Sequence, residues 1–347
     1  MDSKQTLPRR LPDAHKGDFG RILLVGGSRG MAGSIAMSGI AALRMGAGLV
    51  TLAIPDRCLE TVASYHPCLM TLPLPDSEGR LDTGADMVLL DGWASTGRAE
   101  TARADAAKRS PCSTADVVAC GPGMSTGKGA VRVVERLLRD HQGRRVFDAD
   151  AINILAAHRW LDSDPVSSDS GEDRKTAVWN DCVLTPHPGE LARLTGVPAS
   201  DRSGQIRAAG ELACRTGMVI VVKGGPTVVV GPDSNDPTRV RTWTNSTGNP
   251  GMATAGCGDV LTGVVASVMA QKLGPRSGAD RQLSVWDAVR LGVYFHGLAG
   301  DQAAQHRGQV GMLATDLLDE LGRPGVWESP GVASVLERDS DADREHR

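Results

Sequence analysis

A stretch of small residues that ends in an acidic residue carries the clearest chemical signal in this sequence. Residues 245–263 are rich in glycine and run into an apolar segment that predicts a helix beginning near Gly258. The free N–H groups and dipole of a helix N-terminus favour a bound anion, and glycine lets phosphate oxygens approach the backbone. Asp259 would lie in the first helical turn, where it could remove a proton from an attacking hydroxyl. Simple stabilisation of the helix start by Asp259 explains the same pattern equally well.

Two further segments place polar groups after apolar runs that predict strands. Residues 223–227 (Lys-Gly-Gly-Pro-Thr) could contact nucleotide phosphates, although a plain hairpin turn explains them more simply. Residues 185–194 follow another apolar run, and loops at the carboxyl ends of parallel strands bind ligands in open α/β sheets. Within them, His187 is either a substrate contact or a structural residue. Glu190 is adequately explained by the dipole of the helix that follows.

Residues 121–128 (Gly-Pro-Gly-Met-Ser-Thr-Gly-Lys) imitate a phosphate-binding loop but miss the Walker A spacing by one residue. Their loose glycine pattern, with Asp148 after the next expected strand, keeps an NAD-dependent oxidoreductase open as an alternative. That alternative leaves residues 223–227 and 245–259 without a role. A non-catalytic nucleotide-sensing module is a third possibility, and it leaves Asp259 idle.

The elements that must position these residues alternate between short apolar runs and helical segments. Strands are expected at residues 21–25, 49–53, 87–90, 117–119, 145–147, 182–184, 219–222 and 227–230. Helices are expected at 34–45, 129–140, 151–157 and 203–216, and an apolar segment at 311–321 is expected to close the domain. This alternation predicts an α/β fold with a mainly parallel, doubly wound sheet.

Composition narrows the class of protein further. The 347 residues are 41% hydrophobic but only 3% aromatic, so a sizeable core must be mainly aliphatic, and the net charge of −3 argues against a general nucleic-acid binder. The seven cysteines include no Cys-x-x-Cys pair, which argues against a disulfide framework or a zinc ribbon. With no secretory leader and no membrane-spanning run, we expect a cytoplasmic protein. Residues 160–180 are expected to form a surface insertion, and residues 329–347 a disordered charged tail.

Taken together, these segments resemble the ADP/ATP-dependent NAD(P)H-hydrate dehydratase family. The matching stretches follow the family's order across residues 15–325, at 16–33, 41–52, 121–123, 148–151, 185–194, 223–224 and 247–263. The resemblance implies a three-layer ribokinase-like domain over residues 15–328, preceded by a polar extension at residues 1–14. It also implies ADP-dependent dehydration of (6S)-NADHX or (6S)-NADPHX to NADH or NADPH, giving AMP and phosphate. Such an enzyme is a hydro-lyase of nicotinamide nucleotide repair.

The resemblance also assigns roles to individual residues. Asp259 would be the base. The residues that would line the site of the hydrated nicotinamide are Ser34, Gly123, His187 and Asp259. Those that would bind the nucleotide are Lys223, Gly224, Gly225, Pro226, Thr227, Gly256, Cys257 and Gly258. Mg²⁺ would accompany ADP, with no metal ligand assigned. The protein would be a homo-oligomer, a tetramer by resemblance, and would work with a separate NAD(P)HX epimerase.

Cys257 is the main departure from the family pattern, which has Thr or Ser at this place. Because such loops bind phosphate mainly through main-chain N–H groups, we expect the nucleotide site to tolerate the thiol. A helix N-terminus also lowers a thiol's pKa, which makes Cys257 a candidate for oxidation or alkylation. The alternative is that Cys257 is a small, buried and unreactive residue. Within the same fold, a vitamin kinase acting on hydroxyethylthiazole or hydroxymethylpyrimidine is the alternative function, and it would release a stable phosphorylated product.

Overall fold

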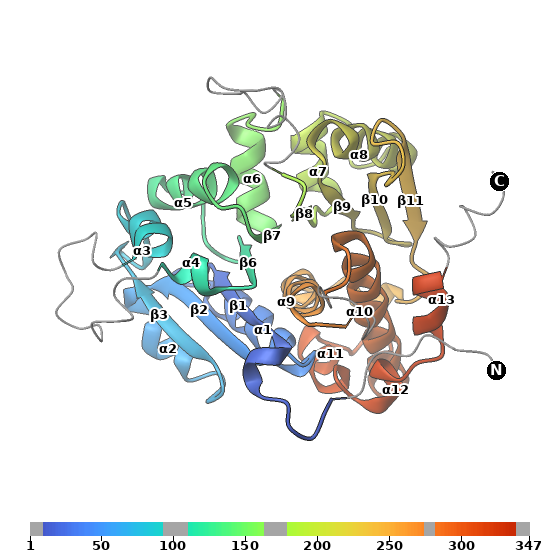
Figure 1. Ribbon diagram of the computed structural model, residues 1–347, viewed down its shortest axis with the longest axis horizontal. Helices are drawn as coiled ribbons and strands as arrows, with labels where there is room; N and C mark the ends of the chain where they lie inside the picture. The colour runs from blue at the N-terminus through green and yellow to red at the C-terminus, as the bar shows by residue number, and fades with distance from the viewer. Residues whose placement is uncertain (1–9, 93–109, 163–178, 274–281, 338–347) are drawn as a thin grey trace.

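A computed structural model describes residues 10–92, 110–162, 179–273 and 282–337. Its strands are β1 (Arg21–Val25), β2 (Leu49–Pro55), β3 (Met70–Leu74), β4 (Asp76–Ser77), β5 (Arg80–Leu81), β6 (Val117–Cys120), β7 (Arg144–Phe147), β8 (Cys182–Leu184), β9 (Val219–Val222), β10 (Val228–Pro232) and β11 (Val240–Thr244). Within the described ranges, nine of them form one sheet in the order β11-β10-β9-β8-β7-β6-β1-β2-β3 (Figure 1). The strands from β3 to β9 are parallel, whereas β10 is antiparallel to both of its neighbours. The remaining pair, β4 and β5, forms a small antiparallel ribbon.

Helices cover both faces of this sheet and make three layers. The helices are α1 (Ala32–Arg44), α2 (Leu59–Ala63), α3 (Ala85–Asp91), α4 (Pro111–Thr114), α5 (Lys128–Arg139), α6 (Ala149–Ala157), α7 (Pro188–Thr195), α8 (Arg202–Thr216), α9 (Cys257–Ala270), α10 (Val285–Arg307), α11 (Ala314–Glu320), α12 (Pro324–Trp327) and α13 (Gly331–Glu337). One core joins the sheet to α1, α2 and α9 to α13, and a second core joins its other face to α3 to α8. No helix in the described ranges is long and apolar enough to cross a membrane.

Strand β1 shows why a central strand carries apolar residues on both of its faces. Ile22 and Leu24 belong to the core under α1 and α9, while Leu23 and Val25 belong to the core on the opposite face. Successive side chains of a strand point to opposite faces of the sheet. Because helices cover both faces here, a central strand does not show the alternation of apolar and polar residues that a half-exposed strand would show. The mainly parallel α/β fold expected from the sequence is confirmed.

Three parts of the sheet differ from expectation. Residues 87–90 are not a strand but part of α3, in which Ala85, Val88 and Leu89 are buried at helical spacing. Edge strands β3 and β11 were not predicted. Strand β3 has one fully buried residue, Leu74, and contains a proline, while β11 buries only Trp243. An edge strand needs little apolar pattern, so these two gave too weak a signal.

The end of the described chain also corrects the sequence prediction. The expectation of disorder from residue 329 is wrong for residues 331–337, which form α13. Val332 and Val335 of α13 are 3% and 4% exposed and join the core beside α10, and the Tyr294 hydroxyl lies 2.8 Å from Ser329 Oγ. Their three-residue spacing creates an apolar helix face, which the charged end of the sequence obscured. The rest of the tail, most of the 160–180 insertion and residues 1–9 lie outside the described residues.

Candidate active site

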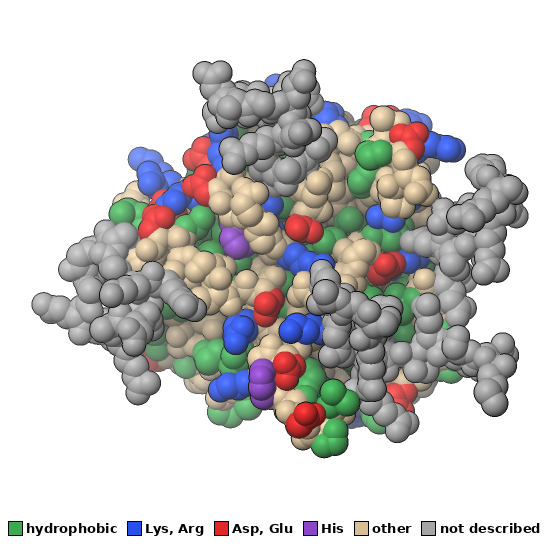
Figure 2. All heavy atoms as spheres, in the orientation of Figure 1, with side chains coloured by type: hydrophobic (Ala, Val, Ile, Leu, Met, Phe, Trp, Pro, Cys, Tyr) green, Lys and Arg blue, Asp and Glu red, His purple; other side chains and the backbone are tan. Residues whose placement is uncertain are grey.

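The loops that leave the carboxyl ends of five parallel strands are joined into one edge. Backbone hydrogen bonds connect each loop to its neighbour: Gly27 N to Pro122 O (2.8 Å), Asp148 N to Cys120 O (3.0 Å), Thr185 N to Phe147 O (3.2 Å) and Lys223 N to Pro186 O (3.1 Å). The N-terminus of α9 meets this edge, with α1 and α10 packed beside it. Acidic and basic side chains gather near the middle of the face in Figure 2, over the region where Figure 1 shows β7 to β9 and α9.

Asp259 lies in the first turn of α9, as the sequence predicts. Gly256 enters the helix with a φ of 92°, a conformation that favours glycine, and an added Cβ would lie 2.7 Å from Met37 Cε. Burial and the nearby Asp148 carboxylate raise the pKa of Asp259 to about 6, while a hydrogen bond from the Ser34 hydroxyl and the charge of Lys223 oppose this rise. A partly desolvated carboxylate with this pKa is suited to accept a proton near neutral pH.

Lys223 reaches the start of the same helix. Its Nζ lies 2.7 Å from Asp148 Oδ1, and a Cβ added to Gly258 would lie 3.2 Å from that Nζ. The other oxygen of the buried Asp148 carboxylate accepts a hydrogen bond of 2.7 Å from Thr262 Oγ1 of α9. The ammonium group is therefore held against the helix N-terminus, where a phosphate group would bind.

Asp148 and Thr262 were not among the predicted site residues. Asp148 directly follows β7, so its place at a strand's carboxyl end was a signal that could have found it. Thr262 lies one helical turn after Gly258 and looks like an ordinary helix residue in the sequence.

The turn at 223–227 has the simpler of the two structures that its sequence allows. It is a hairpin turn, because β9 and β10 pair antiparallel on either side of it. Its first residue also reaches α9, because a Cβ added to Gly258 would lie 3.2 Å from Lys223 Nζ. Within the turn, Thr227 Oγ1 donates a hydrogen bond of 3.0 Å to Gly224 O.

Ser34 and Gly123 lie together on the other side of Asp259. Ser34 is buried in the first turn of α1, and a Cβ added to Gly123 would lie 3.1 Å from Ser34 Cβ and 2.8 Å from Met31 O. Gly123 has a φ of 62°. A side chain here would be strained and would fill the space next to the Ser34 hydroxyl, so the glycine keeps this side of the site open.

His187 is the N-cap of α7 and remains half-exposed. Its ring Nδ1 accepts hydrogen bonds from the backbone N–H groups of Gly189 (3.0 Å) and Glu190 (3.4 Å). The backbone N–H of His187 donates a hydrogen bond to Glu190 Oε2 (2.8 Å). Burial, then the charge of Lys223, lowers the pKa of His187, while burial raises the pKa of Glu190 to about 7. His187 Nε2 also lies 3.2 Å from Glu190 Oε1, so the ring has a structural role at the start of α7.

The thiol of Cys257 is buried at the start of α9. The thiol is 5% exposed, and burial raises its pKa to about 11, with the Asp259 charge adding to the rise and a backbone hydrogen bond from Thr254 opposing it. Desolvation therefore outweighs the helix dipole, and the structure favours the buried, unreactive thiol of the two interpretations that the sequence left open. The Cys257 carbonyl lies 2.9 Å from Nε2 of His296 in α10, another residue that sequence reasoning missed.

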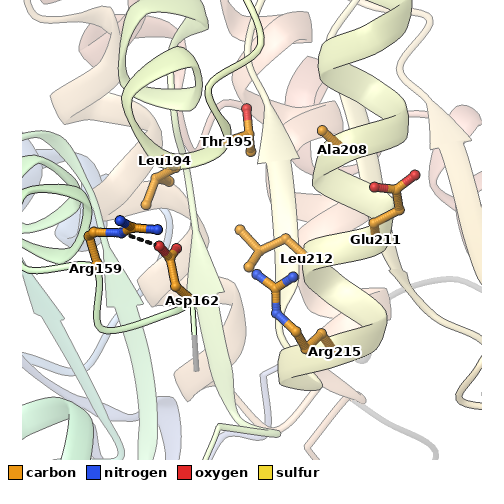
Figure 3. Close-up of a pocket in the computed structure, with 8 residues that line it drawn as sticks. All are labelled: Arg159, Asp162, Leu194, Thr195, Ala208, Glu211, Leu212 and Arg215. Atoms are coloured by element: carbon orange, nitrogen blue, oxygen red, sulfur yellow. Dashed lines mark hydrogen bonds and ion pairs between the residues drawn. The ribbon is translucent and has the colours of Figure 1, made fainter. Parts of the chain in front are cut away.

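The structure also shows a pocket away from this site. A pocket of about 330 Å³ opens between α7 and α8 (Figure 3). It is lined by Arg159, Asp162, Leu194, Thr195, Ala208, Glu211, Leu212 and Arg215, none of which is a predicted site residue. In the same ranges, no three His, Cys, Asp or Glu side chains are grouped so as to hold a metal ion by themselves.

Known proteins match this chain along most of its length. A family model described as NAD(P)H-hydrate dehydratase matches residues 22–323. The bifunctional NAD(P)H-hydrate repair enzyme of Moorella thermoacetica is 39% identical over 320 residues, which cover 92% of this chain and 51% of that protein. The chain thus spans about half the length of such bifunctional relatives. The ADP-dependent (S)-NAD(P)H-hydrate dehydratase of Neisseria meningitidis is 32% identical and is covered over 86% of its length, with 89% of this chain aligned.

Solved structures agree with the sequence matches. The ADP/ATP-dependent NAD(P)H-hydrate dehydratase from Bacillus subtilis, co-crystallised with ATP and Mg²⁺, is 26% identical with a TM-score of 0.64, over 94% of this chain and 95% of that one. A ribokinase-like superfamily protein from Enterococcus faecalis shares the fold at 23% identity, with a TM-score of 0.64 over 92% of this chain and 91% of that one. The chain has the ribokinase-like fold and belongs to the NAD(P)H-hydrate dehydratase family.

Proposed function

We propose that this protein dehydrates (6S)-NADHX and (6S)-NADPHX to NADH and NADPH, using ADP and releasing AMP and phosphate. The observation that carries the proposal is the pairing of a base with a phosphate site. Asp259, with a pKa raised to about 6 by burial, lies in the first turn of the helix against which the Lys223 ammonium is held. Transfer of a phosphoryl group to a hydroxyl needs both groups next to each other.

In the proposed reaction, the ring hydroxyl of the substrate attacks the terminal phosphorus of ADP. A bond forms between the hydroxyl oxygen and phosphorus, the bond from phosphorus to the AMP oxygen breaks, and the hydroxyl proton passes to Asp259. The carbon–oxygen bond of the phosphorylated ring then breaks. Phosphate leaves and the neighbouring ring carbon loses a proton, which restores the double bond of NADH or NADPH. Phosphate is a better leaving group than hydroxide, so the phosphoryl group from ADP makes the elimination easier.

The nucleotide would lie along the N-terminus of α9. We assign its phosphates to Lys223, to the turn that continues to Thr227, and to the N–H groups of residues 256–258. We assign the hydrated nicotinamide to the opposite side of Asp259, between Ser34, Gly123 and His187. The buried hydroxyl of Ser34 and the open space kept by Gly123 support this side for the ring.

We propose ADP as the donor and Mg²⁺ as its companion. The relative from N. meningitidis is described as ADP-dependent, and the B. subtilis structure was obtained with ATP and Mg²⁺. Mg²⁺ bound to a nucleotide keeps several waters and needs only one or two carboxylates, so a cage of protein ligands is not required. We assign no protein ligand to the Mg²⁺. We further propose a cytoplasmic homo-oligomer, a tetramer, that works with an NAD(P)HX epimerase.

The test is to incubate the protein with (6S)-NADHX and to follow the NADH absorbance band with and without ADP and Mg²⁺. We expect NADH to appear only when both are present, with AMP and phosphate formed in equal amounts. A stable phosphorylated product would instead identify a small-molecule kinase. Turnover that needs no nucleotide would point to an oxidoreductase or another reaction, and either result would overturn the proposal.

A further inference from the structure

Arg202, the first residue of α8, is bound to the turn that follows β9. Its Nη1 donates a hydrogen bond of 2.8 Å to Lys223 O, and its Nη2 donates to Val222 O (3.1 Å) and Pro226 O (2.6 Å). One side chain therefore holds both ends of the turn. No sequence pattern indicates this role, because Arg202 looks like an ordinary surface residue at the start of a helix.

These bonds determine which groups of the turn remain available. The carbonyl oxygens of Val222, Lys223 and Pro226 accept from the guanidinium, and Gly224 O accepts from Thr227. Within the described part of the chain, the N–H groups of Gly224 and Gly225 make no hydrogen bond to protein. A Cβ added to Gly225 would meet nothing within 4 Å, so this part of the turn is open. The carbonyl oxygens of residues 222–224 and 226 are therefore occupied by hydrogen bonds within the protein, while the N–H groups of Gly224 and Gly225 can donate to a ligand.

The guanidinium also lies directly against the turn as a positive charge. A Cβ added to Gly224 would lie 3.1 Å from Arg202 Nη1, and the φ of Gly224 is 140°. Among the described residues, no Asp or Glu lies within ion-pair distance of Arg202, whose partners are neutral carbonyls. Burial without a carboxylate partner lowers the pKa of Arg202. A partly buried cation left without a counter-charge is costly unless an anion binds beside it.

We propose that Arg202 is a positioning residue for the nucleotide diphosphate: it holds the turn so that the N–H groups of Gly224 and Gly225 are free for a phosphate, and it places positive charge behind them. The inference rests on the proposed use of ADP. It adds a residue outside the glycine-rich segments to the nucleotide site, and it accounts for the glycine at position 224, where a Cβ would lie 3.1 Å from the guanidinium.

The test compares Arg202→Met with Arg207→Met by calorimetric titration of each protein with ADP and Mg²⁺. Arg207 is exposed on the same helix, so its substitution removes the same charge and leaves the turn unchanged. We expect Arg202→Met to weaken ADP binding about tenfold or more, since several hydrogen bonds and a nearby charge are lost. Arg207→Met should stay within about twofold of the wild type. Equal ADP affinity in the two variants would overturn the inference.

Arg202→Lys decides the case in which Arg202→Met does not fold. An ammonium keeps the charge but cannot reproduce the fork that reaches three carbonyls. We expect ADP binding between that of the wild type and that of Arg202→Met, about threefold to tenfold weaker than wild type, with the KM for ADP raised more than kcat is lowered. An unchanged ADP affinity in a folded Arg202→Lys protein contradicts the inference.

These outcomes separate the inference from the proposed function. A wild type that binds ADP but never converts NADHX refutes the dehydratase, while a weakened Arg202→Met still supports the positioning role. A wild type that converts NADHX, with Arg202→Met binding ADP normally, refutes only the positioning role. A wild type with no affinity for ADP refutes both.

Discussion

Replacing Asp259 by asparagine tests the reasoning about the site most directly. The substitution preserves the shape of the side chain at the start of α9 but removes its ability to accept a proton. A positioned general base contributes about 10²–10⁴ in rate, so kcat should fall by that factor, or about 3–5 kcal/mol of transition-state stabilisation. ADP binding should stay equal or become tighter, because a negative charge beside an anionic ligand has been removed.

The pH dependence of turnover tests the role of Asp259 independently. With a pKa of about 6, the wild-type Asp259 carboxylate is mainly ionised at pH 7 and mainly protonated at pH 5. The base must be ionised, so kcat/KM, which reports the pKa of the enzyme before substrate binds, should fall about tenfold between those two pH values as the acid limb is crossed. Asp259→Asn should lose this limb. Because the folded-state pKa lies above the unfolded one, the wild type loses stability as pH rises through about 6, so Asp259→Asn should melt no lower than wild type at pH 7.

The assays are steady-state turnover of (6S)-NADHX at saturating ADP, calorimetric ADP titration and a thermal melt. Asp287→Asn provides the matched control, because Asp287 is an acidic residue in the first turn of α10 and is not part of the site. It should leave kcat within about twofold and lower only stability. If Asp259→Asn instead keeps wild-type turnover and lowers the melting temperature, Asp259 is only a helix-start residue, and the mechanism is wrong.

Three further predictions follow from the same geometry. Asp148→Asn should move the acid limb of kcat/KM to lower pH, because the Asp148 charge raises the pKa of Asp259; an unshifted limb in the pH profile contradicts this. Cys257→Ser should keep turnover and Cys257→Ala should lose at most about tenfold, while the wild-type thiol should resist alkylation at neutral pH because burial raises its pKa to about 11; rapid alkylation prevented by ADP contradicts the buried placement. Truncation after Pro330 removes α13 and should destabilise the fold by about 2–4 kcal/mol in a denaturant titration, whereas truncation after Glu337 should leave stability unchanged; equal stability of both truncations contradicts the packing of α13.

Much of the fold was determined by local patterns in the sequence. The strands β1, β8 and β9 begin and end where their apolar runs do, because a strand buried on both faces needs an unbroken apolar run. The start of α9 was equally clear, since the glycine-rich stretch before it cannot continue the helix. A short apolar run was a weaker guide. Residues 87–90 predict a strand but belong to α3, because a run of four apolar residues fits either structure.

The site itself depended on contacts that no local pattern records. Lys223 and Asp148 are 75 residues apart and Asp148 and Thr262 are 114 apart, yet all three are joined by hydrogen bonds at one end of α9. The ionisation of Asp259 and Cys257 likewise depends on how much water the packed helices exclude, which decides between the reactive and the unreactive thiol. Sequence patterns report which backbone conformation and which side-chain face a segment prefers. Distances between distant segments, and the desolvation of the groups between them, exist only once the chain has packed.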